Sequence, residues 1–241
     1  MRPKICVPIM GKNKKEVLER IQAVSALPEG AGPDLLEWRA DRFSGDRAGL
    51  LREIREKTGL PLIFTLRLKT EGGFYEGDEK AREEAFLKAL ETDLIQYADI
   101  EQAGAGELKK SVMAEAAARG VKIIMSSHNF EDTPSESEIL RALRDMGEEG
   151  ADIVKYAAMP RAAADVLALL SATAAYAASP DARPAITISM GRLGIMSRVN
   201  GGLFGSAATF ASIMGEVSAP GQIPIADLRR AMDMIYNQRG D

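Results

Sequence analysis

The sequence predicts an α/β fold, a (β/α)8 TIM barrel, and three observations lead to this prediction. Eight short apolar segments, bounded by turn residues, alternate with segments of helical period, as buried parallel strands and their helices do. The apolar segments recur about every 30 residues until a shorter last interval, and this spacing fits one strand and one helix. A length of 241 residues suits a barrel, since α/β barrels commonly form one domain of about 250 residues.

The expected strands follow the apolar segments in chain order. They are Ile5–Met10, Asp34–Asp41, Pro61–Leu68, Leu94–Glu101, Val121–Ser127, Asp152–Ala157, Ala185–Met190 and Leu203–Ala207. An open doubly wound sheet is the alternative, but no Gly-x-Gly-x-x-Gly follows the first strand, which counts against its nucleotide-binding version. No linker or low-complexity segment divides the chain, so we expect residues 1–241 to form a single catalytic barrel domain.

Helices are expected between these strands. Thr133-Pro-Ser-Glu136 has the pattern of a capping box with proline at the first helical position, and Gly150 is expected to end the helix that follows. The buried face of that helix is expected to carry Ile139, Leu140, Leu143 and Met146. The segment Asp78–Glu91 repeats the pattern, and its inward-facing residues are expected to be Phe86, Leu87 and Leu90.

Composition excludes several classes of protein. With 46% apolar and 27% charged residues, the chain has the composition of a soluble globular protein. A net charge of −4 argues against a nucleic-acid partner, which would require a basic surface. Cys6 is the only cysteine, so no intrachain disulfide or cysteine-based metal site is expected, and an apolar segment around it predicts a small buried residue.

Neither a signal peptide nor a membrane span is expected. The first apolar stretch is too short for a signal peptide and is followed by lysines. The alanine-rich segment Ala162–Ala178 is barely long enough for a span, and Asp165 interrupts it. We therefore expect a packed helix there, no membrane partner and a cytoplasmic protein.

Charged residues late in the predicted strands are the first candidates for a site, because barrel chemistry takes place at the carboxyl ends of the strands. Glu37, Arg39 and Asp41 occupy alternate positions, so all three project to one face. They indicate either a structural layer of ion pairs or a polar substrate pocket. Arg67 suits carboxylates and hydroxyls but also a salt bridge at the barrel mouth. Glu71 begins a glycine loop, where it could orient a histidine or remain a solvated charge.

One histidine and one lysine suggest covalent carbonyl chemistry. His128, the only histidine, lies where an apolar run becomes a polar loop, and its imidazole is suited to proton transfer near neutral pH. Lys155 interrupts the next apolar run, where a desolvated neutral amine could condense with a ketone. The alternatives are a loop imidazole bonded to backbone and a lysine that extends outward or pairs with Asp152.

The C-terminal third contains glycine-rich loops, including Met190–Gly194 and Asn200–Gly202. These indicate either a phosphate-binding cradle or simple tight turns. Arg198 is a candidate anchor for an anion. The segment Ser218-Ala-Pro-Gly-Gln222 indicates a mobile lid or a plain surface turn.

Short blocks stand in a specific order along nearly the whole chain. They are Glu37-Trp-Arg-Ala-Asp41, Phe64-Thr-Leu-Arg-Leu-Lys-Thr-Glu-Gly-Gly73, Ser126-Ser-His-Asn-Phe130, Asp152-Ile-Val-Lys155, Ile188-Ser-Met-Gly-Arg-Leu-Gly194 with Ser197-Arg198, Phe204-Gly-Ser-Ala-Ala-Thr-Phe210 and Ser218-Ala-Pro-Gly-Gln222. As a set, these blocks resemble type I 3-dehydroquinate dehydratase, the Schiff-base class of the shikimate pathway. The resemblance also strengthens the prediction of a barrel.

The resemblance implies a lyase that needs no cofactor or metal and converts 3-dehydroquinate to 3-dehydroshikimate plus water, the third step of chorismate and aromatic amino acid biosynthesis. Lys155 would form the Schiff base with the substrate ketone, and the iminium would act as an electron sink. His128 would be the general base and acid, and Glu71 would orient it.

The resemblance implies a set of substrate contacts as well. Arg198 would pair with the substrate carboxylate with help from Ser218 and Gln222 of the lid. The residues Glu37, Arg39 and Arg67 would bind ring hydroxyls, and Met190 and Phe210 would pack against the ring. Some family members have a serine late in the first strand that reaches the substrate, whereas this chain has Pro8, so no contact is assigned there. We expect a free-standing enzyme and, from the resemblance and the frequency of such assemblies, a homodimer.

Two other functions stay open from the sequence. A Schiff-base aldolase on the same barrel would need a phosphate site near Gly191–Gly194 or Gly201–Gly205. A non-catalytic barrel would bind a ligand without turnover.

Overall fold

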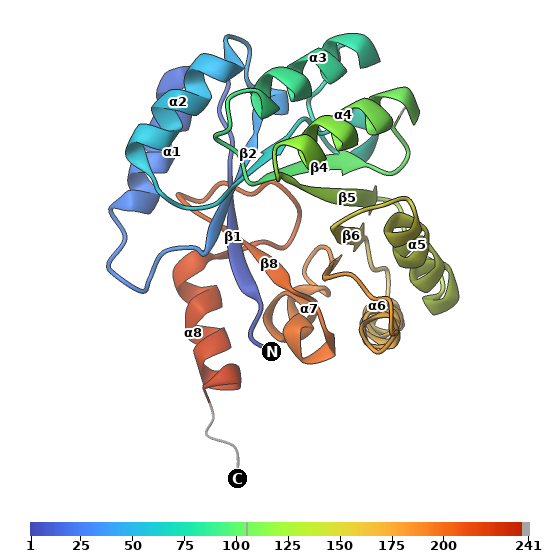
Figure 1. Cartoon of the computed structure of the whole chain (residues 1–241). Helices are drawn as coiled ribbons and strands as arrows, with labels where there is room; N and C mark the ends of the chain where they lie inside the picture. The colour runs from blue at the N-terminus through green and yellow to red at the C-terminus, as the bar shows by residue number, and fades with distance from the viewer. Residues whose placement is uncertain (105, 238–241) are drawn as a thin grey trace.

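Eight parallel strands follow one another around the barrel in the order of the sequence (Figure 1). The computed structural model describes residues 1–104 and 106–237. The strands are β1 (Lys4–Ile9), β2 (Leu35–Arg39), β3 (Leu62–Thr65), β4 (Tyr97–Glu101), β5 (Lys122–Asn129), β6 (Ile153–Ala158), β7 (Ala185–Ser189) and β8 (Ala208–Ser212). Strand β1 pairs with both β2 and β8, and a parallel bridge between Ala185 and Ser206 brings β7 to the β8 side. The (β/α)8 TIM-barrel prediction is confirmed, and no reversal of strand order, as in a doubly wound sheet, occurs within the described residues.

Helices cover the outside of the strands (Figure 1). They are α1 (Lys14–Ser25), α2 (Arg47–Lys57), α3 (Glu79–Leu90), α4 (Gly106–Ala118), α5 (Glu136–Glu148), α6 (Ala163–Ala177), α7 (Ile195–Asn200) and α8 (Ile225–Tyr236). Short 3-10 turns lie at Ala40–Arg42, Lys69–Glu71 and Gly201–Phe204, and a two-residue strand, β9 (Ile223–Pro224), pairs with β8. Across residues 1–104 and 106–237, no helix combines the length and apolar character needed to cross a bilayer.

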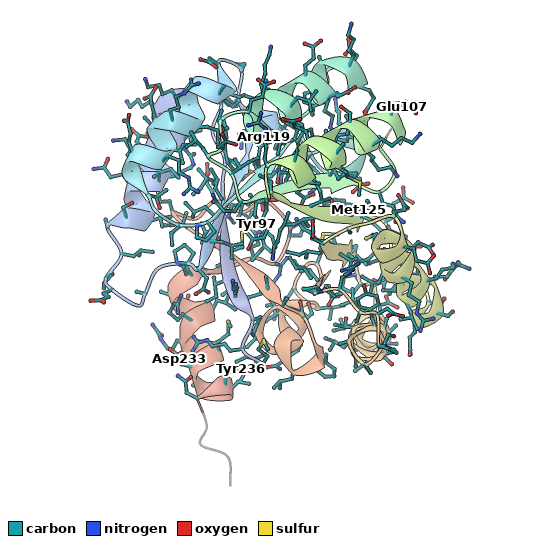
Figure 2. The ribbon with its side chains drawn as sticks, in the orientation of Figure 1. Tyr97, Glu107, Arg119, Met125, Asp233 and Tyr236 are labelled. Carbon is teal, nitrogen blue, oxygen red and sulfur yellow. The ribbon has the colours of Figure 1, made fainter. Side chains whose placement is uncertain are left out.

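Strand alternation divides the core into two layers. Outward-facing side chains such as Leu36, Trp38 and Phe64 pack against the helices, where the Trp38 and Phe64 rings meet edge to face. Met125 of β5 lies in this outer layer (Figure 2). Inward-facing side chains form a second, smaller cluster inside the barrel, and it contains Cys6, which is fully buried as expected. Only alternate residues of each strand face inward. Polar side chains at these positions near the carboxyl ends of the strands can therefore line a pocket without disturbing the outer hydrophobic layer.

The eighth strand was predicted at the wrong place. Leu203 and Phe204 are exposed in a 3-10 turn that ends at Gly205, whose φ of +106° suits glycine. The strand begins instead at Ala208, because alternation there puts Ala208 and Phe210 into the barrel interior. An apolar pair alone did not distinguish an exposed turn from a strand.

Two helix details also differ from the predictions. Helix α5 is capped by Ser135 rather than Thr133: Glu138 and Ser135 each bond the other's backbone N–H, and this second S-x-x-E pattern overlaps the first. Ile139, Leu143 and Met146 are buried as expected, whereas Leu140 is only half-buried. The helix ends before Gly150, which has a φ of +98°, as expected. In α3, Phe86 and Leu90 are buried, but Leu87 lies at the edge of the buried face.

Candidate active site

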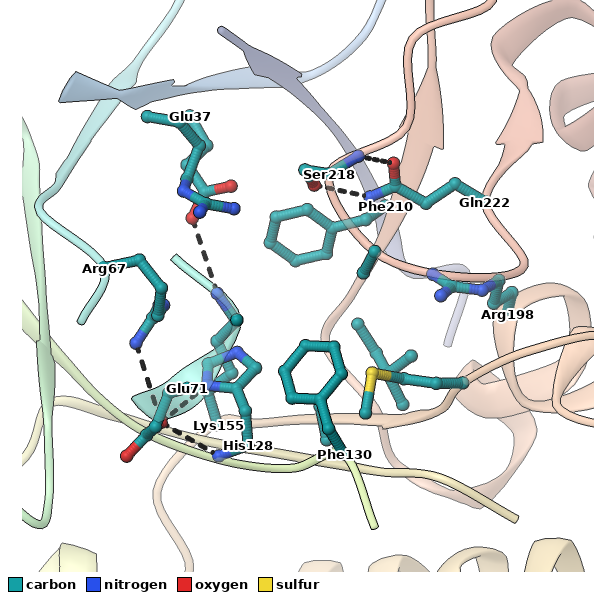
Figure 3. A pocket seen from close by; sticks show the side chains of 16 residues that line it. Glu37, Arg67, Glu71, His128, Phe130, Lys155, Arg198, Phe210, Ser218 and Gln222 are labelled. Carbon is teal, nitrogen blue, oxygen red and sulfur yellow. Dashed lines mark hydrogen bonds and ion pairs between the residues drawn. The ribbon is translucent and has the colours of Figure 1, made fainter. Parts of the chain in front are cut away.

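A pocket lies at the carboxyl ends of the strands, and the residues that line it come from positions 37 to 222 (Figure 3). Every residue to which the family resemblance assigned a role lies on its wall: Glu37, Arg39, Arg67, Glu71, His128, Lys155, Met190, Arg198, Phe210, Ser218 and Gln222. The wall also contains Gly72, Phe130, Ala157, Ile188 and Ala219. The barrel thus brings distant segments of the chain to one place.

Lys155 points into the barrel and has only 4% of its surface exposed. Its Nζ lies 2.7 Å from Asp99 Oδ2 and 3.5 Å from Glu37 Oε1. On another side, Nζ lies 4.7 Å from the centre of the Phe210 ring, within the range of a cation–π contact. Pairing with Asp152 does not occur, since that carboxylate accepts a backbone N–H of β5.

The surroundings of the amine are more polar than the sequence suggested. The neighbours Val154 and Tyr156 face the helices, so they do not enclose the Lys155 side chain. The same face of β6 carries Ile153 and Ala157, but carboxylates from other strands reach the amine. Lys155 is therefore a buried amine within an ion-pair cluster rather than in an apolar cavity.

The carboxylates of β4 are the principal site feature that the sequence analysis missed. Asp99 and Glu101 are buried, and Arg67 donates to both, with Nη2 2.7 Å from Asp99 Oδ1 and Nη1 2.9 Å from Glu101 Oε1. The Ser126 hydroxyl also donates to Asp99 Oδ1, at 2.6 Å. Arg82 of α3 pairs with the other oxygen of Glu101. The alternation in Ala98-Asp-Ile-Glu101, like that in β2, was the available signal.

His128 is oriented by Glu71. One carboxylate oxygen, Glu71 Oε2, lies 2.9 Å from His128 Nδ1 and 3.0 Å from the His128 backbone nitrogen. Burial lowers the pKa of His128 well below its usual value, and the charges of Arg67 and Lys155 lower it further. Burial raises the pKa of Glu71 to about 6. At pH 7 the pair is a carboxylate and a neutral imidazole whose Nδ1 donates, which leaves the Nε2 lone pair as the basic one.

The loop that carries Glu71 is held in place by Gly72 and Phe130. Gly72 has a φ of +75°, and a Cβ there would lie 2.3 Å from the Phe130 ring. Both the backbone conformation and the close ring contact therefore require glycine. Phe130, which no sequence argument placed in the site, packs over this loop and lines the pocket (Figure 3).

Arg198 of α7 offers unused hydrogen-bond donors to the pocket. Its exposure is 1%, and Nη2 donates to the Pro220 carbonyl at 2.7 Å. Among the residues that the structure describes, none accepts from its Nε or Nη1. Burial lowers the pKa of this guanidinium to about 10, yet it stays charged at neutral pH. A buried charged donor without an acceptor is costly, so these atoms are suited to an anionic ligand.

The segment Ser218–Gln222 lies beside Arg198 as part of the pocket wall. The Pro220 carbonyl also accepts the Gly191 N–H at 3.0 Å, which joins the segment to the loop after β7. Within the segment, the Gln222 side chain accepts from the Ser218 backbone and donates to the Ser218 hydroxyl. In the structure this segment is therefore bonded to Arg198 and to the loop after β7, and it forms part of the pocket wall.

The charged face of β2 serves both purposes that the sequence left open. Arg39 and Asp41 form a bidentate pair, with both N–O distances 2.8 Å, and Asp41 also accepts the Phe74 N–H at 3.0 Å. Glu37 and Arg39 line the pocket, and the Thr65 hydroxyl donates to Glu37. One strand thus supplies a structural ion pair and part of the pocket wall.

These features define the class of protein. A buried amine, a neutral imidazole with its carboxylate partner, and a guanidinium with free donors share one pocket at the carboxyl ends of parallel strands. In residues 1–104 and 106–237, no cluster of three or more His, Cys, Asp or Glu side chains is placed to hold a metal ion. The molecule is a (β/α)8-barrel enzyme, and this pocket lies at the end of the barrel where such enzymes usually have their sites.

Comparisons with known proteins identify the family. The family described as type I 3-dehydroquinase matches residues 5–239, and the chain belongs to that family. The 3-dehydroquinate dehydratase of Klebsiella pneumoniae is 42% identical over 237 residues, covering 96% of this chain and 92% of the relative. That of Bacillus subtilis is 40% identical, covering 99% of this chain and 94% of the relative. The crystal structure of the Clostridium difficile enzyme with covalently modified comenic acid is 35% identical with a TM-score of 0.90, covering 99% of this chain and 94% of that one.

Proposed function

We propose that this enzyme dehydrates 3-dehydroquinate to 3-dehydroshikimate through a Schiff base on Lys155, with His128 as general acid and base. The observation that carries the proposal is one pocket lined by a buried amine and by a neutral imidazole whose Nδ1 is held by Glu71. Relatives of about 40% identity over nearly the whole chain carry the name of this activity. The covalent modification in the C. difficile structure is further support for covalent chemistry in the family.

In the proposed reaction, Lys155 Nζ bonds to the ketone carbon, and the ketone oxygen leaves as water. The resulting iminium draws electrons from the adjacent carbon, so the C–H bond there becomes acidic. His128 Nε2 takes this proton and gives an enamine. The enamine electrons then expel the hydroxyl group on the next carbon, which leaves as water after it receives the proton from His128. Hydrolysis of the iminium frees the conjugated ketone and the amine.

Glu71 and the pocket wall have supporting roles in this scheme. The Glu71 carboxylate stabilises the imidazolium that forms when His128 takes the proton, because it already accepts the Nδ1 hydrogen bond. Arg198 would pair with the substrate carboxylate beside Ser218 and Gln222. The ring hydroxyls would meet Glu37, Arg39 and Arg67. Arg67 also has three carboxylate partners in the protein: Asp99 at 2.7 Å, Glu101 at 2.9 Å and Glu71 at 3.9 Å. Met190 and Phe210 would pack against the ring.

The activity is tested by measuring ultraviolet absorbance, which increases as the conjugated ketone forms from 3-dehydroquinate. A class I aldolase would instead cleave sugar phosphates, so those substrates form the second arm. The glycines that such a phosphate site would need are explained by close packing: a Cβ on Gly194 would lie 1.9 Å from the Ser189 carbonyl oxygen, and one on Gly205 2.4 Å from Ala177 Cβ. Turnover of sugar phosphates without turnover of dehydroquinate would overturn the proposal.

Arg198→Gln is expected to raise KM for 3-dehydroquinate by about 10- to 100-fold with a smaller change in kcat. The reason is that the charged donors Nε and Nη1 are lost, and hydrogen bonds to charged groups contribute roughly 1.5–3 kcal/mol. Arg192, an exposed arginine in the loop before α7, gives the matched control: Arg192→Gln should leave KM unchanged. An unchanged KM in the Arg198 variant would contradict the assigned carboxylate contact.

Turnover is expected to fall about tenfold between pH 7 and pH 5 as Glu71 takes up a proton with its pKa of about 6. Protonated Glu71 no longer serves as the anionic partner of His128. Because burial raises the pKa of Glu71, the folded state binds this proton more tightly than the unfolded state does. Protonation of Glu71 therefore stabilises the folded enzyme, and the loss of rate at low pH is not caused by unfolding at this residue. In a pH profile of kcat, Glu71→Gln should have a low rate and lack this acid limb, whereas the exposed-site control Glu84→Gln should keep it. If the Glu71 variant kept the same acid limb in its kcat profile, the limb would have to come from the titration of another group.

The wider biological setting belongs to the same proposal. Residues 1–241 would act as one catalytic domain, in the cytoplasm, at the third step of chorismate and aromatic amino acid biosynthesis. A homodimer is proposed from the general frequency of two-fold assemblies. Light scattering of the purified enzyme tests the oligomeric state, and growth of a shikimate-pathway mutant supplied with this chain tests the step.

A further inference from the structure

Asp99 touches the amine that would react, although the scheme above gives it no role. Its side chain has no exposed surface, and its Oδ2 lies 2.7 Å from Lys155 Nζ. Its other oxygen, Oδ1, is held by Arg67 at 2.7 Å and by the Ser126 hydroxyl at 2.6 Å. Burial disfavours the charged form, but Arg67 and Lys155 outweigh burial and hold the pKa of Asp99 well below its usual value. Asp99 is therefore a carboxylate across the neutral range, and Oδ2 is aimed at Nζ.

The charge at this nitrogen is the same at both ends of the condensation step. An ammonium group and a ketone give an iminium and water: the N–C bond forms, the C–O double bond breaks, two nitrogen protons leave with the oxygen, and one proton stays on nitrogen. The neutral amine and the neutral carbinolamine occur only between these ends. A fixed carboxylate beside Nζ can thus pair with the ammonium before the step and with the iminium after it.

The number of protons left on nitrogen identifies which carboxylate forms that pair. An iminium has a single N–H, so it donates to one acceptor, whereas the ammonium group can donate to Asp99 and approach Glu37 together. Asp99 Oδ2 is the nearer oxygen at 2.7 Å, and Glu37 Oε1 at 3.5 Å already accepts from the Thr65 hydroxyl. Building on the Schiff-base reaction proposed above, we propose that Asp99 is the counterion of the Lys155 iminium and keeps the imine protonated until His128 takes the carbon-bound proton.

The role matters because only the protonated imine is an effective electron sink. Without the Asp99 carboxylate, the nearer of its two negative neighbours, an imine in a pocket that also contains Arg67 would lose its proton more readily. Loss of that proton would stop the reaction before the C–H bond is broken. The two bonds to Oδ1 make the counterion rigid, so it does not have to reorient when the ammonium becomes an iminium.

The test is reductive trapping across a pH series. Cyanoborohydride reduces the iminium but not the neutral imine, so the trapped fraction on Lys155, measured by mass spectrometry with 3-dehydroquinate, reports the protonated form. In wild type the fraction should stay level from about pH 6 to about pH 9. The midpoint is the pH at which the trapped fraction has fallen to half. In Asp99→Asn this midpoint should move down by about 1–3 pH units, the effect of removing an opposite charge within a few ångströms. The kcat should fall roughly 100-fold, as when one preorganised electrostatic group is removed.

Two further variants separate charge from structure. Ser126→Ala removes a hydrogen bond to Asp99 but keeps the carboxylate, so it should retain the wild-type midpoint. If Asp99→Asn does not fold, the pair Asp99→Asn with Arg67→Gln leaves the net charge of the buried cluster unchanged, and it is compared with Arg67→Gln alone. The midpoint of trapping should be lower in the double variant than in Arg67→Gln alone.

Equal midpoints with and without the Asp99 carboxylate would overturn the counterion. Absence of a trapped adduct in wild type at every pH, with turnover present, would instead overturn the Schiff base itself. The two proposals can thus fail separately.

Discussion

Lys155→Ala is expected to abolish adduct formation and to lower kcat by roughly 10⁵-fold or more, the scale seen when a covalent nucleophile is removed. The substitution removes Nζ, which lies 2.7 Å from Asp99 Oδ2 and 4.7 Å from the centre of the Phe210 ring, so the pocket loses the amine that would attack the ketone. Rates with 3-dehydroquinate and the mass of the enzyme after reduction measure the two effects. Lys122→Ala, an exposed lysine on the neighbouring strand, should match wild type in both.

Folding of the Lys155 variant needs its own measurement. The substitution leaves Asp99 paired with Arg67, so we expect a folded barrel with a lower unfolding temperature. Circular dichroism and thermal unfolding show whether this holds. A folded Lys155→Ala enzyme that retained even one hundredth of the wild-type kcat would be incompatible with covalent catalysis at this residue.

His128→Ala is expected to form the imine slowly and then stall, with kcat reduced by about 10²- to 10⁴-fold. The amine can still attack the ketone, but no neutral imidazole remains to take the carbon-bound proton. Trapped adduct should therefore accumulate while the conjugated ketone does not form. Exchange of the substrate's carbon-bound proton with deuterium, followed by NMR, measures the stalled step directly.

Two observations support or contradict this role. Ser127→Ala, on the same strand at the position that faces away, is the control and should exchange the proton at the wild-type rate. In wild type, His128 is the only histidine, so its imidazole titration by NMR is unambiguous and should give a pKa below the usual value. Normal proton exchange in the His128 variant would assign the base to another residue.

The sequence predicted the barrel because its signal is repeated. Each short apolar segment is weak evidence alone, but regular spacing over the chain favoured alternating strands and helices. The error at Leu203–Ala207 arose where spacing shortened and apolar residues belonged to an exposed turn. Tertiary closure, through pairing of Ala208–Ser212 with β1, decided the strand there.

The pocket residues that could be named from the sequence came from two sources, polar positions late in strands and the resemblance to a family. Neither source could give the contacts within the site. For example, Asp99 and Lys155 are far apart in sequence and meet only when the barrel forms. Asp99 itself was within reach of the alternation rule that drew attention to Glu37. Phe130 was not, since its contact with Gly72 depends on the conformations of two loops.

The most direct test of the central claim is to incubate the enzyme with 3-dehydroquinate, reduce it with borohydride and locate the added mass. The proposed mechanism predicts one adduct, on the peptide that contains Lys155, and none after the same treatment with sugar phosphates. Full turnover of 3-dehydroquinate with no adduct, or with an adduct on a different residue, would contradict it.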